Sequence, residues 1–156
     1  MPALQRRDAR PEDAAAIIEW FPTRQEAVRW GGPATPDPLV ADWLVQHFAS
    51  AAYWVWTDAT GAIQAVAGLT AQHDGLVLLN RFAVAPGMRG QGLAASFLGE
   101  MMNIARQRGH TSMSLWVYGS NPIARRVYDG QGFEAVGQRI AEEDASGISI
   151  NMQREL

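Results

Sequence analysis

The chain has 156 residues, of which 47% are hydrophobic and 19% charged, and its formal net charge at pH 7 is −3. This composition excludes a disordered protein and predicts a single globular domain over residues 1–156 with a sizeable core. The slight negative charge argues against a broad nucleic-acid-binding surface, because such domains are usually basic.

Cysteine is absent, which excludes disulfides, a thiolate nucleophile and cysteine-ligated metal centres. The three histidines, His47, His73 and His110, have no metal-ligand spacing, so we expect no metal site. No run of the sequence approaches the roughly 20 apolar residues of a membrane span, and the first residues have no apolar signal core. We therefore expect a cytoplasmic protein that binds neither membrane nor nucleic acid.

The first third of the chain favours helices. The elements that we predict here are an extended segment at Leu4–Arg7 and helices at Pro11–Trp20, Thr23–Trp30 and Leu39–Ala49. In each helix the apolar residues recur every three to four positions, which is helical spacing. Thr23 and Glu26 have the spacing of a capping box at the start of the second helix. Glycines and prolines make residues 31–38 a loop.

From Tyr53 the hydrophobic pattern changes period. The elements that we predict are strands at Tyr53–Thr57, Ile63–Thr70 and Leu76–Val84, a helix at Gln91–Arg108, a strand at Ser112–Tyr118, a helix at Pro122–Gly130 and strands at Phe133–Gln138 and Ile148–Met152. Short turns between the first three strands indicate an antiparallel meander. The order predicts a mixed α/β fold with an antiparallel front half and a helix crossing between strands.

The segment Phe82–Ala94, FAVAPGMRGQGLA, carries the most information. It is typical of a strand end, a glycine-rich turn and the first turn of a helix. Gly90 and Gly92 remove side chains where the N–H groups of a starting helix point outward, and such groups bind anions, most often phosphate. Arg89 adds a positive charge, so the loop favours a phosphorylated cofactor.

Three interpretations of this loop compete. A dinucleotide-binding fold requires G-x-G-x-x-G near the first strand, whereas the spacing here is Gly87-x-x-Gly90-x-Gly92 after a meander. A kinase-type phosphate loop requires a lysine, and the chain has none. The third interpretation is a turn that serves only chain geometry, and the loop alone leaves it open beside the phosphate site.

A second motif, NPIARRVYDGQGF at Asn121–Phe133, narrows the choice. Together with VAPGMRGQGLA it resembles the GCN5-related N-acetyltransferase (GNAT) family over about Leu76–Gly137. The positions that match the two family motifs are Arg89, Gly92 and Ala94, then Asn121, Ala124, Tyr128, Gly132 and Phe133. The resemblance implies an α+β fold with a mixed, mostly antiparallel central sheet flanked by helices.

The resemblance also implies that acetyl-CoA is the cosubstrate. The strand end, made of Phe82, Ala83 and Val84, would pair with the pantetheine arm, and the Phe82 N–H would stabilise the developing oxyanion. The residues that would cradle the pyrophosphate through their N–H groups are Arg89, Gly90, Gln91, Gly92, Leu93 and Ala94. Asn121 would fix the cofactor near the thioester, although a helix N-cap is an equally good interpretation.

Tyr128 occupies the position at which the family places its general acid. A phenol beside the sulfur can protonate the departing thiolate, and the alternative is a tyrosine packed in the core. Without a cysteine to carry the acyl group, we expect direct attack by a primary amine through a tetrahedral intermediate. The strand before the loop reads Leu79-Asn80-Arg81 and contains no carboxylate to act as base.

The sequence says less about the site of the acceptor than about the site of the cofactor. Glu26, Asp37 and residues 142–144 are candidate bases, with solvated charges as the alternative. The aromatic residues Trp20, Phe21 and Trp30, with the acids of residues 142–144, would suit a cationic amine, but they also suit a core. We expect a small-molecule or peptide amine, and the resemblance leaves a homodimer open. The alternatives are a non-catalytic acyl-CoA-binding sensor, another acyl group, or transfer to a hydroxyl.

Overall fold

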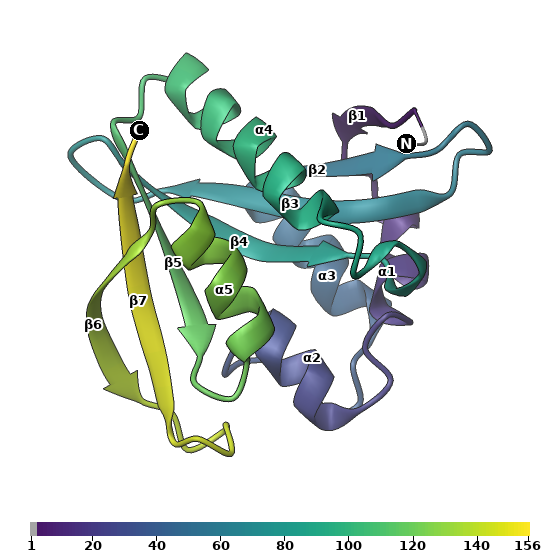
Figure 1. Ribbon diagram of the computed structural model, residues 1–156. Helices are drawn as coiled ribbons and strands as arrows, with labels where there is room; N and C mark the ends of the chain where they lie inside the picture. Colours follow the sequence, from purple (N-terminus) through teal and green to yellow (C-terminus); the bar gives the residue numbers. More distant parts are fainter. Residues whose placement is uncertain (1–2) are drawn as a thin grey trace. The chain divides into compact units, whose positions relative to one another are not determined.

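The computed structural model describes residues 3–156 (Figure 1). Its strands are β1 (Gln5–Asp8), β2 (Ala52–Thr57), β3 (Ile63–Ala71), β4 (Leu76–Val84), β5 (Ser112–Tyr118), β6 (Glu134–Ile140) and β7 (Ile148–Glu155). Its helices are α1 (Ala14–Ile18), α2 (Arg24–Gly31), α3 (Ala41–Ser50), α4 (Leu93–Gln107) and α5 (Pro122–Gly130), with 3₁₀ turns η1 (Pro11–Asp13) and η2 (Pro86–Met88).

The strands form one hydrogen-bonded sheet in the order β1-β2-β3-β4-β5-β7-β6. Strand β4 pairs in parallel with β5, whereas the pairs β1–β2, β2–β3, β5–β7 and β6–β7 are antiparallel. The mixed, mostly antiparallel sheet with helices is therefore confirmed.

The chain folds into two compact units. Unit 1 comprises residues 3–69 and Asn80–Leu93, and unit 2 comprises Thr70–Leu79 and Ala94–Leu156. The chain passes from one unit to the other within β3 and within β4. A single domain over residues 1–156 stays a prediction.

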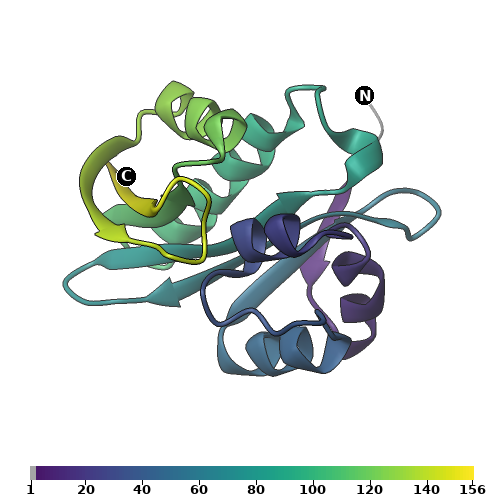
Figure 2. The ribbon, with the colours of Figure 1, turned by 90° about the horizontal axis from the view of Figure 1, so that it is seen from below.

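Unit 1 has an apolar core between its helices and its strands. Figure 2 shows α1 and α3 next to each other on one face of β2 and β3. The core residues that these elements contribute include Ala14, Ile17, Leu44, Tyr53, Val55 and Val66. This arrangement agrees with the helical spacing of the apolar residues in the sequence.

An ion pair fixes the start of unit 1. Arg7 donates to both carboxylate oxygens of Asp13, at 2.8 and 2.9 Å, and the Arg10 N–H donates to the same carboxylate at 2.7 Å. Burial raises the pKa of Asp13, but the hydrogen bonds from Arg7 and Arg10 outweigh it, so the pKa is lowered. Asp13 is therefore a charged group that holds β1 to η1.

Unit 2 is built around β5. The side chains that unit 2 buries most deeply include Phe97, Leu98, Met101, Met113, Leu115 and Met152. In α4, Phe97 and Met101 are four residues apart and lie on one buried face of the helix. Figure 1 shows β5, β7 and β6 side by side, with α5 next to them.

Several element boundaries differ from the sequence prediction. Helix α1 ends at Ile18 because the Trp20 N–H bonds to the carbonyl three residues back, which closes a tighter turn. Helix α3 begins at Ala41 because Val40 is extended, with φ −124° and ψ 148°. Strand β7 continues to Glu155, which pairs with Ser112 of β5.

Candidate active site

The expected site residues divide between the two units. Phe82–Leu93 belongs to unit 1, whereas Ala94, Asn121 and Tyr128 belong to unit 2.

Two glycines shape the loop between β4 and α4. Gly90 and Gly92 have φ values of 76° and 74°, in the left-handed region that side chains with a Cβ rarely adopt. A Cβ built at either position would have no neighbour within 4 Å. The glycines are therefore required by backbone conformation and leave open space above the loop. Because the first N–H groups of a helix have no partner within it, the loop and the start of α4 fit an anionic group.

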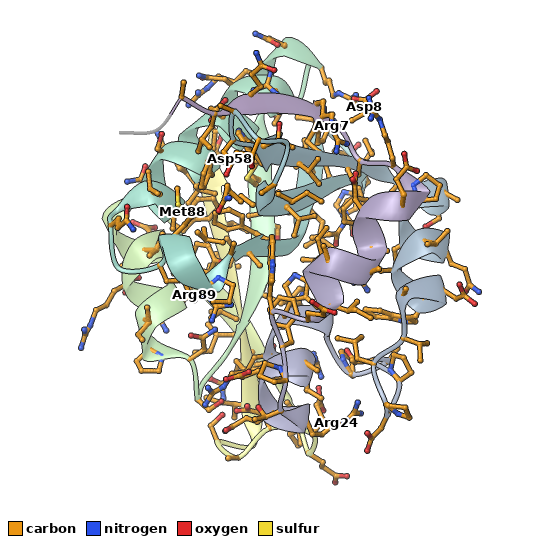
Figure 3. All side chains as sticks on the ribbon, turned by 90° about the vertical axis from the view of Figure 1, so that its right-hand side faces the viewer. Arg7, Asp8, Arg24, Asp58, Met88 and Arg89 are labelled. Carbon is orange, nitrogen blue, oxygen red and sulfur yellow. The ribbon has the colours of Figure 1, made fainter. Side chains whose placement is uncertain are left out.

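Two side chains close this loop on itself. The Nε of Arg89 donates to the Val84 carbonyl at 3.0 Å, and the Nε2 of Gln91 donates to the Gly87 carbonyl at 3.3 Å. Figure 3 shows Arg89 next to Met88 on this loop. Arg89 is thus tied to the end of β4, and its two Nη groups supply further donors.

Strand β4 contains a left-handed residue that the sequence did not predict. Arg81 has a φ of 45°, a conformation that is uncommon for a residue other than glycine. The indole N–H of Trp30 donates to the Arg81 carbonyl at 2.9 Å. Phe82, Ala83 and Val84 follow directly and are half-buried. The left-handed Arg81 therefore directly precedes the three residues expected to contact the pantetheine arm.

The side chain of Arg81 is held among aromatic rings. Its Nη1 donates to the Tyr53 hydroxyl at 3.0 Å, and its guanidinium carbon lies 5.1 Å from the Trp43 ring centroid. Trp30 meets Trp43 edge-on with ring centroids 6.0 Å apart and stacks on Phe21 at 4.3 Å. We call Phe21, Trp30, Trp43, Tyr53 and Arg81 the Arg81 cluster.

Glycines make room for two rings of this cluster. A Cβ at Gly68 would lie 2.5 Å from the Tyr53 ring, and a Cβ at Gly31 would lie 2.8 Å from the Trp43 ring. Burial raises the pKa of Tyr53, and the charge of Arg81 opposes this. The Tyr53 phenol is therefore a neutral partner for the guanidinium.

Two buried side-chain atoms among the described residues 3–156 have no hydrogen-bond partner, the Oε2 of Glu26 and the Nε of Arg81. Glu26 lies on α2, one helical turn before Trp30. Leaving such a group unpaired costs about 1–3 kcal/mol, so each requires an explanation. Glu26 was a candidate base in the sequence, but the burial of its oxygen could not be read there.

In unit 2, Tyr128 is 9% exposed, and its ring meets Phe133 edge-on at 6.0 Å. Burial raises the pKa of Tyr128 to about 12, with no charged or hydrogen-bonded group contributing among residues 3–156. Tyr128 is therefore a neutral phenol with a proton to donate. The Oδ1 of Asn121 accepts from the Ala124 N–H at 3.3 Å and caps α5, which leaves its amide group as a donor.

Two of the three acids in the β6–β7 loop, residues 141–147, have structural partners. Glu143 accepts from the Tyr118 hydroxyl at 2.7 Å and from Arg139 at 3.1 Å. Asp144 accepts from the hydroxyls of Ser120 and Ser146. These contacts use two of the candidate bases from the sequence, Glu143 and Asp144, and favour a structural role for both.

No group of three or more His, Asp or Glu side chains within residues 3–156 is arranged to hold a metal ion. None of the helices in this range is long and apolar enough to cross a membrane.

The chain matches known proteins over most of its length. A model of the acetyltransferase (GNAT) family matches residues 15–133. A GCN5-related N-acetyltransferase from Kribbella flavida has a TM-score of 0.79 at 22% identity, over 99% of this chain and 98% of that chain. A phosphinothricin acetyltransferase from Sinorhizobium meliloti, solved with AcCoA, has a TM-score of 0.75 at 23% identity, over 98% of this chain and 88% of that chain.

A spermidine N-acetyltransferase from Vibrio cholerae, solved with CoA and spermine, has a TM-score of 0.79 at 17% identity, over 97% of this chain and 95% of that chain. These structural likenesses show a shared fold, and the family match carries the assignment. Acetyl-CoA as the expected cosubstrate and acyl transfer as the expected chemistry are thereby supported at the level of the family. The chain belongs to the GNAT family and is an acetyltransferase.

Proposed function

We propose that this enzyme transfers an acetyl group from acetyl-CoA to a primary amine on a small molecule or peptide, and that residues 1–156 act as one acetyltransferase domain. The observation that supports this function best is the loop before α4, where Gly90 and Gly92 are left-handed with open space above them. The relatives named for phosphinothricin and spermidine favour a small-molecule acceptor.

Acetyl-CoA supplies the reactive thioester. In this proposal the N–H groups from Arg89 to Ala94 bind its pyrophosphate, since unpaired N–H groups at a helix start favour anions. The backbone of Phe82, Ala83 and Val84 pairs with the pantetheine arm, and the Phe82 N–H stabilises the oxyanion of the tetrahedral intermediate. The Asn121 amide donates near the thioester.

Tyr128 serves as the general acid of the proposed reaction. The amine nitrogen forms a bond to the thioester carbon, and the C–S bond then breaks. Tyr128 gives its proton to the departing sulfur. The amine releases one proton to solvent, and Tyr128 later takes one proton from solvent, so the protons balance. The raised pKa of Tyr128, about 12, keeps the phenol protonated until that step.

The first experiment measures thermal stability with acetyl-CoA and thiol release across a panel of primary amines. Acetyl-CoA should raise the melting temperature, because it binds only the native state, and at least one amine should release thiol. No shift at millimolar acetyl-CoA would contradict the proposal. A shift without thiol release from any amine would indicate the acyl-CoA-binding sensor instead.

A glycine pair tests the loop. Gly90→Ala and Gly61→Ala place a Cβ at left-handed positions that both have open space around them. Both variants should lose similar stability, about 1 kcal/mol, but only Gly90→Ala should weaken acetyl-CoA binding in calorimetry. Equal affinities in the two variants would remove the loop from the cofactor site.

A tyrosine pair tests the acid. Tyr128→Phe should lower kcat about 100-fold or more while the affinity for acetyl-CoA is kept. Tyr118→Phe removes the hydroxyl that bonds to Glu143 and should keep kcat near the native value. Unchanged kcat in Tyr128→Phe would leave Tyr128 as a packing residue.

A further inference from the structure

The two unpartnered buried atoms of unit 1 belong to an acidic and a basic side chain. The Oε2 of Glu26 is an acceptor, and the Nε of Arg81 is a donor. Glu26 lies one turn before Trp30 on α2, and the Trp30 indole is bonded to the Arg81 carbonyl. An anionic and a cationic group therefore stand near the same indole, each with hydrogen-bonding capacity that residues 3–156 do not use.

The guanidinium of Arg81 is held in place by groups that leave this capacity unused. Tyr53 accepts from Nη1, and the Trp43 ring lies under the guanidinium carbon. Gly68 and Gly31 make room for these two rings, so the arrangement is built into the fold. A fixed guanidinium with an unused Nε–H suits a carboxylate, which takes two parallel N–H donors.

The same contacts argue against a polyamine. A cation-binding aromatic cage needs a ring face that the ligand can cover. In the Arg81 cluster the guanidinium already lies over Trp43, and a ligand cation there would meet a like charge. In the β6–β7 loop, Glu143 is bonded to Tyr118 and Arg139, and Asp144 is bonded to Ser120 and Ser146.

We propose, on the basis of the function proposed above, that the acceptor is an α-amino acid whose carboxylate is bound by Arg81 and whose amino group is bound by Glu26. Arg81 directly precedes Phe82, whose N–H is proposed to face the thioester carbonyl. A carboxylate on Arg81 would thus hold the α-amino nitrogen close to that carbonyl. The Oε2 of Glu26 accepts a hydrogen bond from this nitrogen, takes the proton that it loses on attack and then passes that proton to solvent.

Matched substrates test this directly in the native enzyme. Each L-α-amino acid is compared with its decarboxylated amine and its α-amide, and spermidine is included. The kcat/KM for the best amino acid should exceed that for its amine and its amide by at least about 10-fold, the worth of one hydrogen bond to a charged group. Equal values, or spermidine as the best substrate, would overturn the proposal.

A variant pair assigns the preference to Arg81. Arg81→Met should abolish the advantage of the amino acid over its amine while the acetyl-CoA thermal shift is kept. Arg106→Met, which removes an exposed arginine of α4, should leave the advantage unchanged. Calorimetric binding of the amino acid, weakened at least about 10-fold in Arg81→Met, gives a readout that needs no turnover. A preference kept in a folded Arg81→Met would overturn the role of Arg81.

These outcomes separate the two proposals. Thiol release from amines, without preference for the amino acid, refutes the acceptor class and leaves the acetyltransferase function in place. Thiol release from no amine, with Arg81-dependent binding of an amino acid, refutes the function and supports the binding role. If Arg81→Met does not fold, Arg81→Lys keeps the charge without the planar donors and should lose most of the preference.

Discussion

Arg81 of unit 1 and Arg139 of unit 2, on the strand before the β6–β7 loop, both lie among aromatic rings. In unit 2 the guanidinium carbon of Arg139 lies 5.6 Å from the Trp116 ring centroid and 5.9 Å from that of Tyr118. Arg139 also donates to Glu143, at 3.1 Å. In unit 1 the Nε of Arg81 and the Oε2 of Glu26 have no partner among the described residues.

This difference separates two uses of buried polar groups. Folding requires that such groups be bonded, because an unpaired one costs free energy. In the β6–β7 loop the buried Asp144 meets this requirement through Ser120 and Ser146, so this acid stabilises the fold. The Arg81 cluster does not meet it, and a ligand would supply the missing partners. Acceptor recognition is accordingly expected at the Arg81 cluster.

The largest expected effect on stability is in the β6–β7 loop. Asp144→Ala should reduce the free energy of unfolding by about 2–3 kcal/mol, because Ser120 and Ser146 lose their acceptor. Urea unfolding measures this effect. The neighbouring Glu142→Ala, at an exposed position, should stay within about 0.5 kcal/mol of the native protein. A small change in Asp144→Ala would show that the loop is not held by this acid.

A smaller effect is expected on acidification. Burial raises the pKa of Asp144, but hydrogen bonds from Ser120 and Ser146 outweigh it, and the pKa is lowered. An acid whose pKa is lowered in the folded state contributes stability above its unfolded pKa, about 3.9, and this is lost as the pH falls through the folded pKa. Between about pH 5 and pH 2, the range in which carboxylates titrate, Asp144→Asn should therefore lose less free energy of unfolding than the native protein does. Urea unfolding at a series of pH values measures this. The same slope in both proteins would contradict this assignment.

Local patterns predicted most of the fold. Strands β4 and β5 and helix α5 have the predicted bounds, because apolar runs between turns, alternation in β5 and an Asn-Pro helix start are signals within a few residues. The family resemblance was also carried by two short motifs. The Arg81 cluster could not be predicted, because Arg81 and Tyr53 are 28 positions apart in the sequence. The left-handed backbone at Arg81 could not be predicted either, because the residue is not a glycine. Asp144 and Ser120, which are 24 positions apart, are a similar case.

A modest effect is expected at Glu143, which is more exposed than Asp144. Burial, and then the hydrogen bond to Glu143, raises the pKa of Tyr118 to about 12. Glu143→Gln should lower the pKa of Tyr118, since the carboxylate no longer disfavours the phenolate, and should cost at most about 1 kcal/mol of stability. Ultraviolet titration of the phenols, with Tyr118→Phe to identify the signal, measures this. An unchanged titration would mean that burial alone sets the pKa of Tyr118.

Arg81→Met is expected to have the smallest effect on stability and the largest effect on the choice of acceptor. Arg81→Met loses the hydrogen bond to Tyr53 and the contact with Trp43, but it also removes a buried donor that has no partner. These contributions oppose each other, so the free energy of unfolding should stay within about 1 kcal/mol of the native value. Urea unfolding beside Asp144→Ala gives the comparison. If Arg81→Met lost as much free energy of unfolding as Asp144→Ala, Arg81 would be a structural residue like Asp144. A small loss together with a changed acceptor preference would show that Arg81 serves ligand recognition and not folding.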